Sequence, residues 1–196
     1  MDTVDTYLDG LQQALAALSR DDVRAVVSEL ERVWRDGRVV YLIGNGGSAA
    51  TASHMMNDLV KVTRVPGRRR LKAIALTDNV PLMTAVANDQ EYADVFLEPL
   101  MSLLADGDAL IAISGSGNSP NIVKAVEFAR ARGTRVIGFC GSPGGRLAEL
   151  AHLRVIVPAP LIGQQEDGHM ILDHVVTMAL AERIAAHPPS EAETRL

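Results

Sequence analysis

The stretch from Val39 to Asp58 constrains the fold of this chain more than any other part of the sequence. It opens with the apolar, largely β-branched run Val39–Ile43, which predicts a buried strand of a parallel sheet. The glycine-rich turn Gly44–Gly47 follows, and Ser48 is the expected N-cap of a helix. Because free backbone N–H groups and the positive end of the helix dipole point at such a turn, this unit predicts an anion-binding site.

A second unit of the same kind follows later in the chain. The predicted strand Ala109–Ile113 runs into the loop Ser114–Ser119, which offers three hydroxyl groups and several backbone N–H groups. A phosphate group needs many donors and little side-chain bulk, so this loop suits one. The first loop has neither the spacing of a dinucleotide site nor that of a P-loop, and no nucleotide cofactor is expected. Two such loops at the ends of two strands predict one shared pocket.

The rest of the chain alternates between apolar runs and amphipathic segments. Two helices are expected within residues 3–36, before the first strand, and they could cover the sheet or pair with another subunit. Further elements are expected as strands at residues 71–76, 135–140 and 153–157, helices at residues 120–132, 146–151 and 164–186, a polar turn at residues 87–90, and a helix at residues 92–104 broken at Pro99. This order predicts an α/β fold, a three-layer sandwich around a five-stranded parallel sheet.

Length and composition limit the organisation and the partners. We expect one domain over residues 1–187, with a helical pair at residues 1–36 and a disordered tail at residues 188–196. The net charge of −5 gives no support to a nucleic-acid partner. The sequence has neither a membrane-spanning run nor a signal-peptide pattern, so no membrane partner and a cytoplasmic location are expected. The single cysteine, Cys140, is interpreted as a buried thiol.

Two helices carry the polar groups that could do chemistry. His54 and Asp58 are spaced i, i+4 and share one helix face. On the C-terminal helix, Glu166 and His174 lie about 80° apart and can face one pocket, while His169 and Asp173 are spaced as a structural pair. Two imidazoles and two carboxylates can transfer protons or bind zinc or another divalent ion, and spacing alone leaves both open.

At this point the motifs resemble a known family. The resemblance is to the sugar isomerase (SIS) family, and within it to isomerases of seven-carbon sugar phosphates. It extends over residues 5–186 and rests on four ordered motifs: Gly44–Ala49, Ala87–Asp89, Ile113–Ser119, and Glu166 with His169 and His174. The resemblance implies a flavodoxin-like sheet and a homotetramer with sites between subunits. It also implies conversion of sedoheptulose 7-phosphate to D-glycero-D-manno-heptose 7-phosphate through an enediol.

The resemblance assigns roles to individual residues. Asp58 would be the catalytic carboxylate and His174 the catalytic histidine. The zinc set present in some members maps to His54, Asp58, Glu166 and His174. The phosphorylated sugar would contact Asn45, Gly46, Gly47, Ser48, Asn88, Asp89, Ser114, Gly115, Ser116, Ser119 and Glu166.

The chain departs from the family pattern at several of these positions. Asp58 replaces the usual glutamate, Gly115 replaces threonine, and Val62 stands at a position that is usually arginine. Glu166 replaces glutamine, and its added negative charge favours a metal. These departures leave an isomerase of another ketose phosphate as an alternative. A non-catalytic SIS module, either phosphosugar-binding or a replication-initiator-associating adaptor, is the alternative from another class, but it would need no facing acid and base.

Overall fold

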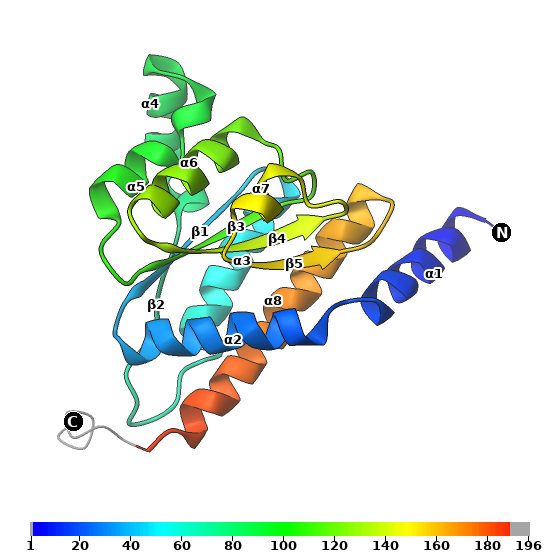
Figure 1. Ribbon diagram of the computed structural model, residues 1–196, viewed down its shortest axis with the longest axis horizontal. Helices are drawn as coiled ribbons and strands as arrows, with labels where there is room; N and C mark the ends of the chain where they lie inside the picture. Colours follow the sequence, from blue (N-terminus) through cyan, green and yellow to red (C-terminus); the bar gives the residue numbers. More distant parts are fainter. Residues whose placement is uncertain (1, 189–196) are drawn as a thin grey trace.

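The computed structural model describes residues 2–188 and has five strands and eight α-helices over that range (Figure 1). The strands are β1 (Val39–Gly44), β2 (Lys72–Ala75), β3 (Ala109–Ser114), β4 (Arg135–Gly141) and β5 (Leu153–Val157). The helices are α1 (Thr3–Ala16), α2 (Arg20–Arg35), α3 (Gly47–Lys61), α4 (Val80–Asp89), α5 (Leu97–Leu103), α6 (Pro120–Ala131), α7 (Gly145–Leu150) and α8 (Ile162–Ala186). The predicted α/β class, the five strands, the two N-terminal helices and the long C-terminal helix are confirmed.

All strand pairs are parallel, and the sheet order is β2-β1-β3-β4-β5. The order reverses between β1 and β3, so the carboxyl ends of these two strands form the switch point where α/β sheets bind ligands. Both predicted loops lie there, because one follows β1 and the other follows β3. The sheet therefore supports the expectation that the two loops are neighbours.

Helices cover both faces of the sheet, as in Figure 1. Side chains of α2, α3 and α8 pack on one face against Leu42 and Ile111, and side chains of α5, α6 and α7 pack on the other against Ile43 and Leu110. Neighbouring strand residues point to opposite faces, so a strand buried on both faces must be apolar at every position. This requirement explains the unbroken apolar run of β1.

Three local predictions were wrong. Gly46, with φ of 55°, is the N-cap of α3, and Ser48 lies inside the first turn; this positive φ favours glycine over serine. Residues 87–89 form the last turn of α4 instead of a polar turn. Pro99 lies in the first turn of α5, where its missing N–H is tolerated, and the break comes before Leu97. The predicted tail at residues 188–196 falls, apart from Pro188, outside the described residues.

Candidate active site and metal centre

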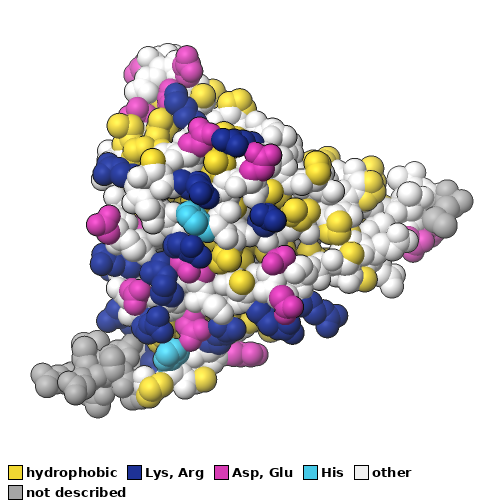
Figure 2. Space-filling view, viewed as in Figure 1, with side chains coloured by type: hydrophobic (Ala, Val, Ile, Leu, Met, Phe, Trp, Pro, Cys, Tyr) yellow, Lys and Arg dark blue, Asp and Glu magenta, His cyan; other side chains and the backbone are white. Residues whose placement is uncertain are grey.

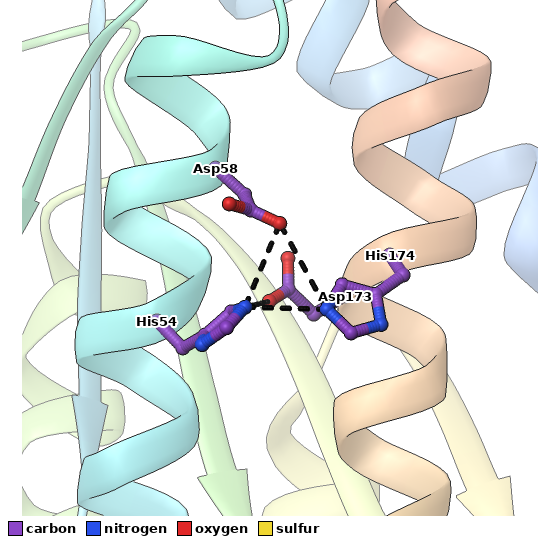
Figure 3. Close-up of side chains that lie close together, drawn as sticks. All are labelled: His54, Asp58, Asp173 and His174. Carbon is purple, nitrogen blue, oxygen red and sulfur yellow. Dashed lines mark hydrogen bonds and ion pairs between the residues drawn. The ribbon is translucent and has the colours of Figure 1, made fainter.

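Four side chains meet where α3 packs against α8 (Figure 3). His54 Nε2 lies 3.2 Å from His174 Nε2, and Asp58 Oδ2 lies 3.7 Å from His54 Nε2 and 3.9 Å from His174 Nε2. Asp173 Oδ2 lies 4.0 Å from His54 Nε2. The sequence placed two of these residues on each helix, and the packing of α3 on α8 makes them one cluster.

One side of the cluster is exposed to solvent, and the opposite side is buried. The side chains of His54 and His174 are 44% and 49% exposed, whereas Asp58 is 14% exposed and Asp173 is fully buried. On α3, His54 and Asp58 are one turn apart, whereas on α8 Asp173 and His174 are adjacent in sequence. A small molecule can therefore reach the imidazoles and Asp58 from solvent, but not Asp173.

The donor atoms of these four residues lie within 4.8 Å of one another, so the group could hold a metal ion. Imidazole nitrogen and carboxylate oxygen are the ligands of zinc and similar divalent ions. Burial, reinforced by the nearby Asp58 carboxylate, raises the pKa of Asp173 to about 7. The chemistry of the donor set and the buried carboxylate both fit a cation.

Glu166 lies away from this group in the structure. A Cβ placed on Gly47 would be 2.4 Å from Glu166 Oε1, so the carboxylate covers the start of α3. His54 is two turns further along α3, about 10 Å at 1.5 Å per residue. Within one chain, Glu166 is thus placed at the glycine turn, and Asp173 joins the two histidines and Asp58.

His169 does not form the predicted hydrogen-bonded pair with Asp173. Both side chains are buried, and neither imidazole nitrogen of His169 nor either oxygen of Asp173 hydrogen-bonds to the other residue. The His169 ring instead stacks on Phe139 with 6.4 Å between ring centres. Burial lowers the pKa of His169 to about 4, although the Cys140 backbone opposes the shift.

The buried neutral His169 predicts a loss of stability in acid. In the unfolded chain His169 is protonated below its ordinary pKa of 6.5, whereas in the folded chain it is protonated only below its lowered pKa of about 4. Between pH 7.5 and 5.0 this lowers the free energy of unfolding by about 2 kcal/mol. Urea unfolding at both pH values, with chelator present, should show that His169→Leu lacks this part of the decrease. Equal pH dependence in both proteins would contradict the assignment.

A reciprocal amide pair joins the loop after β1 to the first turn of α6, which directly follows the serine loop. Asn45 Nδ2 donates to Asn121 Oδ1 at 2.9 Å, and Asn121 Nδ2 donates to Asn45 Oδ1 at 2.8 Å. The hydroxyl of Tyr92 also donates to Asn45 Oδ1 at 3.1 Å. Sequence reasoning missed Asn121 and Tyr92. The only signal at Asn121 was a polar residue among the apolar positions of α6, where it is 1% exposed.

In the serine loop, Ser114–Ser119, some groups hold the loop's conformation and others remain free to contact a ligand. Ser114 is buried, and its Oγ accepts from the Gly117 N–H at 3.1 Å, so it shapes the loop. Ser116 is exposed, and Ser119 is the N-cap of α6 without forming a side-chain cap. A Cβ on Gly115 would be 2.4 Å from Ile162 Cδ1, so a larger residue here would require the Ile162 side chain to move. Ser116, Ser119 and the first turn of α6 are therefore the groups an anion could reach.

The remaining predicted site residues lie elsewhere in the single chain. Asn88 and Asp89 are exposed at the end of α4, which Figure 1 shows projecting from the body away from α8. Cys140 is buried as expected, and burial raises the pKa of its thiol to about 12, so it is no nucleophile. One chain thus brings Asp58 close to His174, and Asn45 close to the start of α6 after the serine loop. Asn88 and Asp89 lie apart from both groups.

A parallel sheet of this order, with a serine loop at its switch point and an acid–imidazole cluster between α3 and α8, defines an α/β domain of the class that binds ligands at the carboxyl ends of its strands. The family model described as the SIS domain matches residues 6–141, and the chain belongs to that family.

Within the family, the chain is similar to phosphoheptose isomerases. It is 33% identical to that of Geobacter sulfurreducens over 187 residues, covering 94% of this chain and 98% of the relative. The solved phosphoheptose isomerase of Neisseria gonorrhoeae matches with a TM-score of 0.83 and 27% identity, over 91% of this chain and 95% of that one. That of Francisella tularensis matches with a TM-score of 0.84 and 26% identity, over 93% and 100%.

Proposed function

We propose that this protein is an aldose–ketose isomerase that converts sedoheptulose 7-phosphate to D-glycero-D-manno-heptose 7-phosphate. The observation that carries the proposal is the 3.9 Å separation of Asp58 Oδ2 and His174 Nε2 at the open side of the cluster. A carboxylate and an imidazole so close to each other can act on adjacent atoms of one substrate. The similarity to phosphoheptose isomerases supports the choice of substrate.

The proposed reaction moves one proton between neighbouring carbons. Asp58 takes the proton from C1 of the ketose, which leaves an enediol, and returns it to C2 to form the aldose. His174 moves a hydroxyl proton in the same direction, from the oxygen on C1 to the oxygen on C2, so that the oxygen on C2 becomes a hydroxyl as the oxygen on C1 becomes a carbonyl. No redox partner is needed, because the two sugars have the same composition.

We propose zinc as the cation of the cluster, held by His54, Asp58 and His174 together with one further carboxylate. When bound, the ion would supply Lewis-acid stabilisation of negative charge on the sugar oxygens. The structure has two carboxylates in the cluster and a third, Glu166, at the start of α3, while the substrate carries an anionic phosphate. Holding a cation would also reduce the repulsion between these charges.

The phosphate is proposed to bind at the serine loop, remote from the reacting carbons. Ser116, Ser119 and the N-terminus of α6 would donate to it, and the first turn of α6 has no acidic residue to oppose it. Asn45, Gly46 and Gly47 at the end of β1 would contact the sugar. Binding at a distance from C1 and C2 positions the substrate over Asp58 and His174.

Replacing Ser116 by Ala is expected to raise KM about fivefold to tenfold with little change in kcat. A phosphate contact acts in both the ground state and the transition state, so losing it weakens binding without altering the chemical step. Steady-state kinetics with the sugar phosphate checks this. Ser142→Ala, in the loop after β4, is the matched control and should change neither parameter. An unchanged KM for Ser116→Ala would contradict the phosphate-loop assignment.

We further propose a homotetramer whose subunits complete one another's sites. Val4 and Leu8 on α1, and Val175 and Met178 on α8, are exposed apolar side chains, and a groove of about 410 Å³ lies between α2 and α8. Assembly would cover these residues and could bring Asn88 and Asp89 of one subunit to the cluster of another. Light scattering should give a mass of about 84 kDa, four times the 21.0 kDa chain.

On the face in Figure 2, Lys and Arg side chains lie among Asp and Glu side chains. Within residues 2–188, no helix combines the length and the hydropathy that crossing a membrane requires. A sugar phosphate and other copies of the chain remain the partners that we propose.

Proton exchange with solvent tests the function directly. Purified, zinc-loaded protein is incubated with sedoheptulose 7-phosphate in D₂O, and the C1 proton signals are followed by NMR. The proposal expects the exchangeable C1 proton signal to decrease while signals of the aldose appear. Absence of both, with and without added zinc, would show that the protein is no isomerase of this sugar. Exchange with another ketose phosphate alone would retain the reaction and change the substrate.

A further inference from the structure

Asp173 is a buried carboxylate without the hydrogen bonds that such a group requires. It is 0% exposed, and neither oxygen has a hydrogen-bond partner within residues 2–188. Burying a charged group without a partner is strongly unfavourable, and native proteins pair such groups or use them as metal ligands. Asp173 therefore differs from a carboxylate that serves the fold.

Asp108 shows what a structural aspartate looks like in this same chain. It is 3% exposed, and its two oxygens accept from the backbone N–H groups of Val39 and Ala105, both at 2.9 Å. Asp108 joins the start of β1 to the turn before β3, which is an ordinary structural role. Asp173 has no such pairing.

The Asp173 carboxylate points into the cluster of His54, Asp58 and His174, as Figure 3 shows. Its side chain approaches from the buried side of α8, beneath the two imidazoles, with Oδ2 4.0 Å from His54 Nε2. The other acidic group near it is Asp58, and the negative charges of the two carboxylates repel each other. Two carboxylates held together beside two imidazoles repel each other, and a divalent cation bound between them would relieve that repulsion.

We propose that Asp173 is the inner ligand of a divalent-cation site completed by His54, Asp58 and His174, and that Glu166 stays outside this coordination sphere. The inference deepens the metal part of the proposed function and rests on it. It makes the site a two-histidine, two-aspartate centre formed within one chain. Glu166 is then free to face the sugar at the glycine turn.

The spacing of the donor atoms supports four ligands around one ion. A tetrahedral zinc ion with ligands at about 2.0–2.1 Å holds its ligand atoms roughly 3.3 Å apart. The separations in the cluster are 3.2, 3.7, 3.9 and 4.0 Å. The two remaining donor pairs also lie within 4.8 Å, so side-chain rotations that bring the donor atoms closer by up to about 1.5 Å would complete the site. Glu166 lies against Gly47, about two helical turns along α3, and would need a larger movement.

Zinc affinity of single variants tests the assignment. Full-length protein stripped with chelator is titrated with Zn²⁺ in competition with a chromophoric chelator. Asp173→Asn, which keeps the shape and removes the charge, is expected to raise the Kd for Zn²⁺ at least tenfold. Glu166→Gln is expected to change it less than threefold, and so is Asp108→Asn, the matched buried control. His54→Ala, expected to lose binding, is the positive control.

Thermal unfolding gives a second readout that does not depend on activity. In chelator, Asp173→Asn should unfold at the same temperature as wild type or higher, because the carboxyl group that it replaces is buried and has no hydrogen-bond partner among the described residues. Asp108→Asn should unfold at a lower temperature, because it loses an ionic hydrogen bond. Adding Zn²⁺ should raise the unfolding temperature of wild type and of Asp108→Asn, and raise that of Asp173→Asn much less.

Several results would overturn the inference. An increase in Kd of less than tenfold for Asp173→Asn would remove it from the ligand set, and a larger loss for Glu166→Gln would put Glu166 there instead. An unfolding temperature of Asp173→Asn in chelator below that of wild type would make Asp173 a structural residue. Tight zinc binding through Asp173 in a protein inactive on sugar phosphates would support the inference and refute only the proposed activity.

Discussion

Asp58→Asn is expected to lower kcat for the isomerisation about 10²- to 10⁴-fold, the usual contribution of a general base. The amide keeps the shape of the side chain but cannot take a proton from carbon. Affinity for the sugar phosphate should stay within about tenfold, because the serine loop and the turn after β1 still bind it. Steady-state kinetics, together with calorimetric titration of the sugar phosphate, measures both quantities.

Asp58 also belongs to the cluster that could hold the cation, so the experiment must separate its two roles. The variant is assayed at saturating Zn²⁺, with metal content determined on the same sample. Asp167→Asn is the matched control, since Asp167 lies on α8 but its Oδ2 accepts from the Tyr7 hydroxyl at 2.7 Å instead of facing the cluster. A fully metallated Asp58→Asn protein that retains more than about a tenth of wild-type kcat would exclude Asp58 as the base.

Removing the divalent cation is expected to lower turnover about 10²- to 10³-fold, because such an ion supplies several kcal/mol of charge stabilisation. Without it, the carboxylates of Asp58 and Asp173 stand unneutralised at the site of an anionic substrate. Dialysis against chelator, followed by assay and elemental analysis, measures the loss. Stoichiometric Zn²⁺ should restore turnover, and Mg²⁺ should restore less, since the imidazole ligands of His54 and His174 suit zinc better.

The control for metal removal is a measurement showing that the chelator leaves the fold intact. Far-ultraviolet circular dichroism should be unchanged by chelator, because the packing of α3 on α8 rests on apolar side chains such as Met55, Leu59, Leu172 and Val176. Full activity in protein shown to contain almost no metal would mean that the four residues act by proton transfer alone.

Most of the fold could be predicted because each element carries a periodic pattern of its own. Strand β1 is an unbroken apolar run, and β3 is apolar up to its last residue, Ser114, a pattern that a sheet covered on both faces requires. The N-cap of α3 was missed because Ser48 has good capping chemistry, and the positive φ of Gly46 decides where the helix begins. The last turn of α4 was missed because Asn88 and Asp89 have the composition of a turn, and composition does not report the hydrogen bonds that continue a helix.

The sequence by itself determined the α/β class, the two polar loops, and the candidates His54, Asp58 and His174, because strand runs, glycine turns and i, i+4 pairs are local and repeat along the chain. Only the tertiary structure decided that Asp173 enters the cluster while Glu166 lies against Gly47. Spacing along α8 fixes the directions in which side chains point. Which of those directions meets α3, and at what height along it, is set by how two helices far apart in sequence pack on the sheet and on each other.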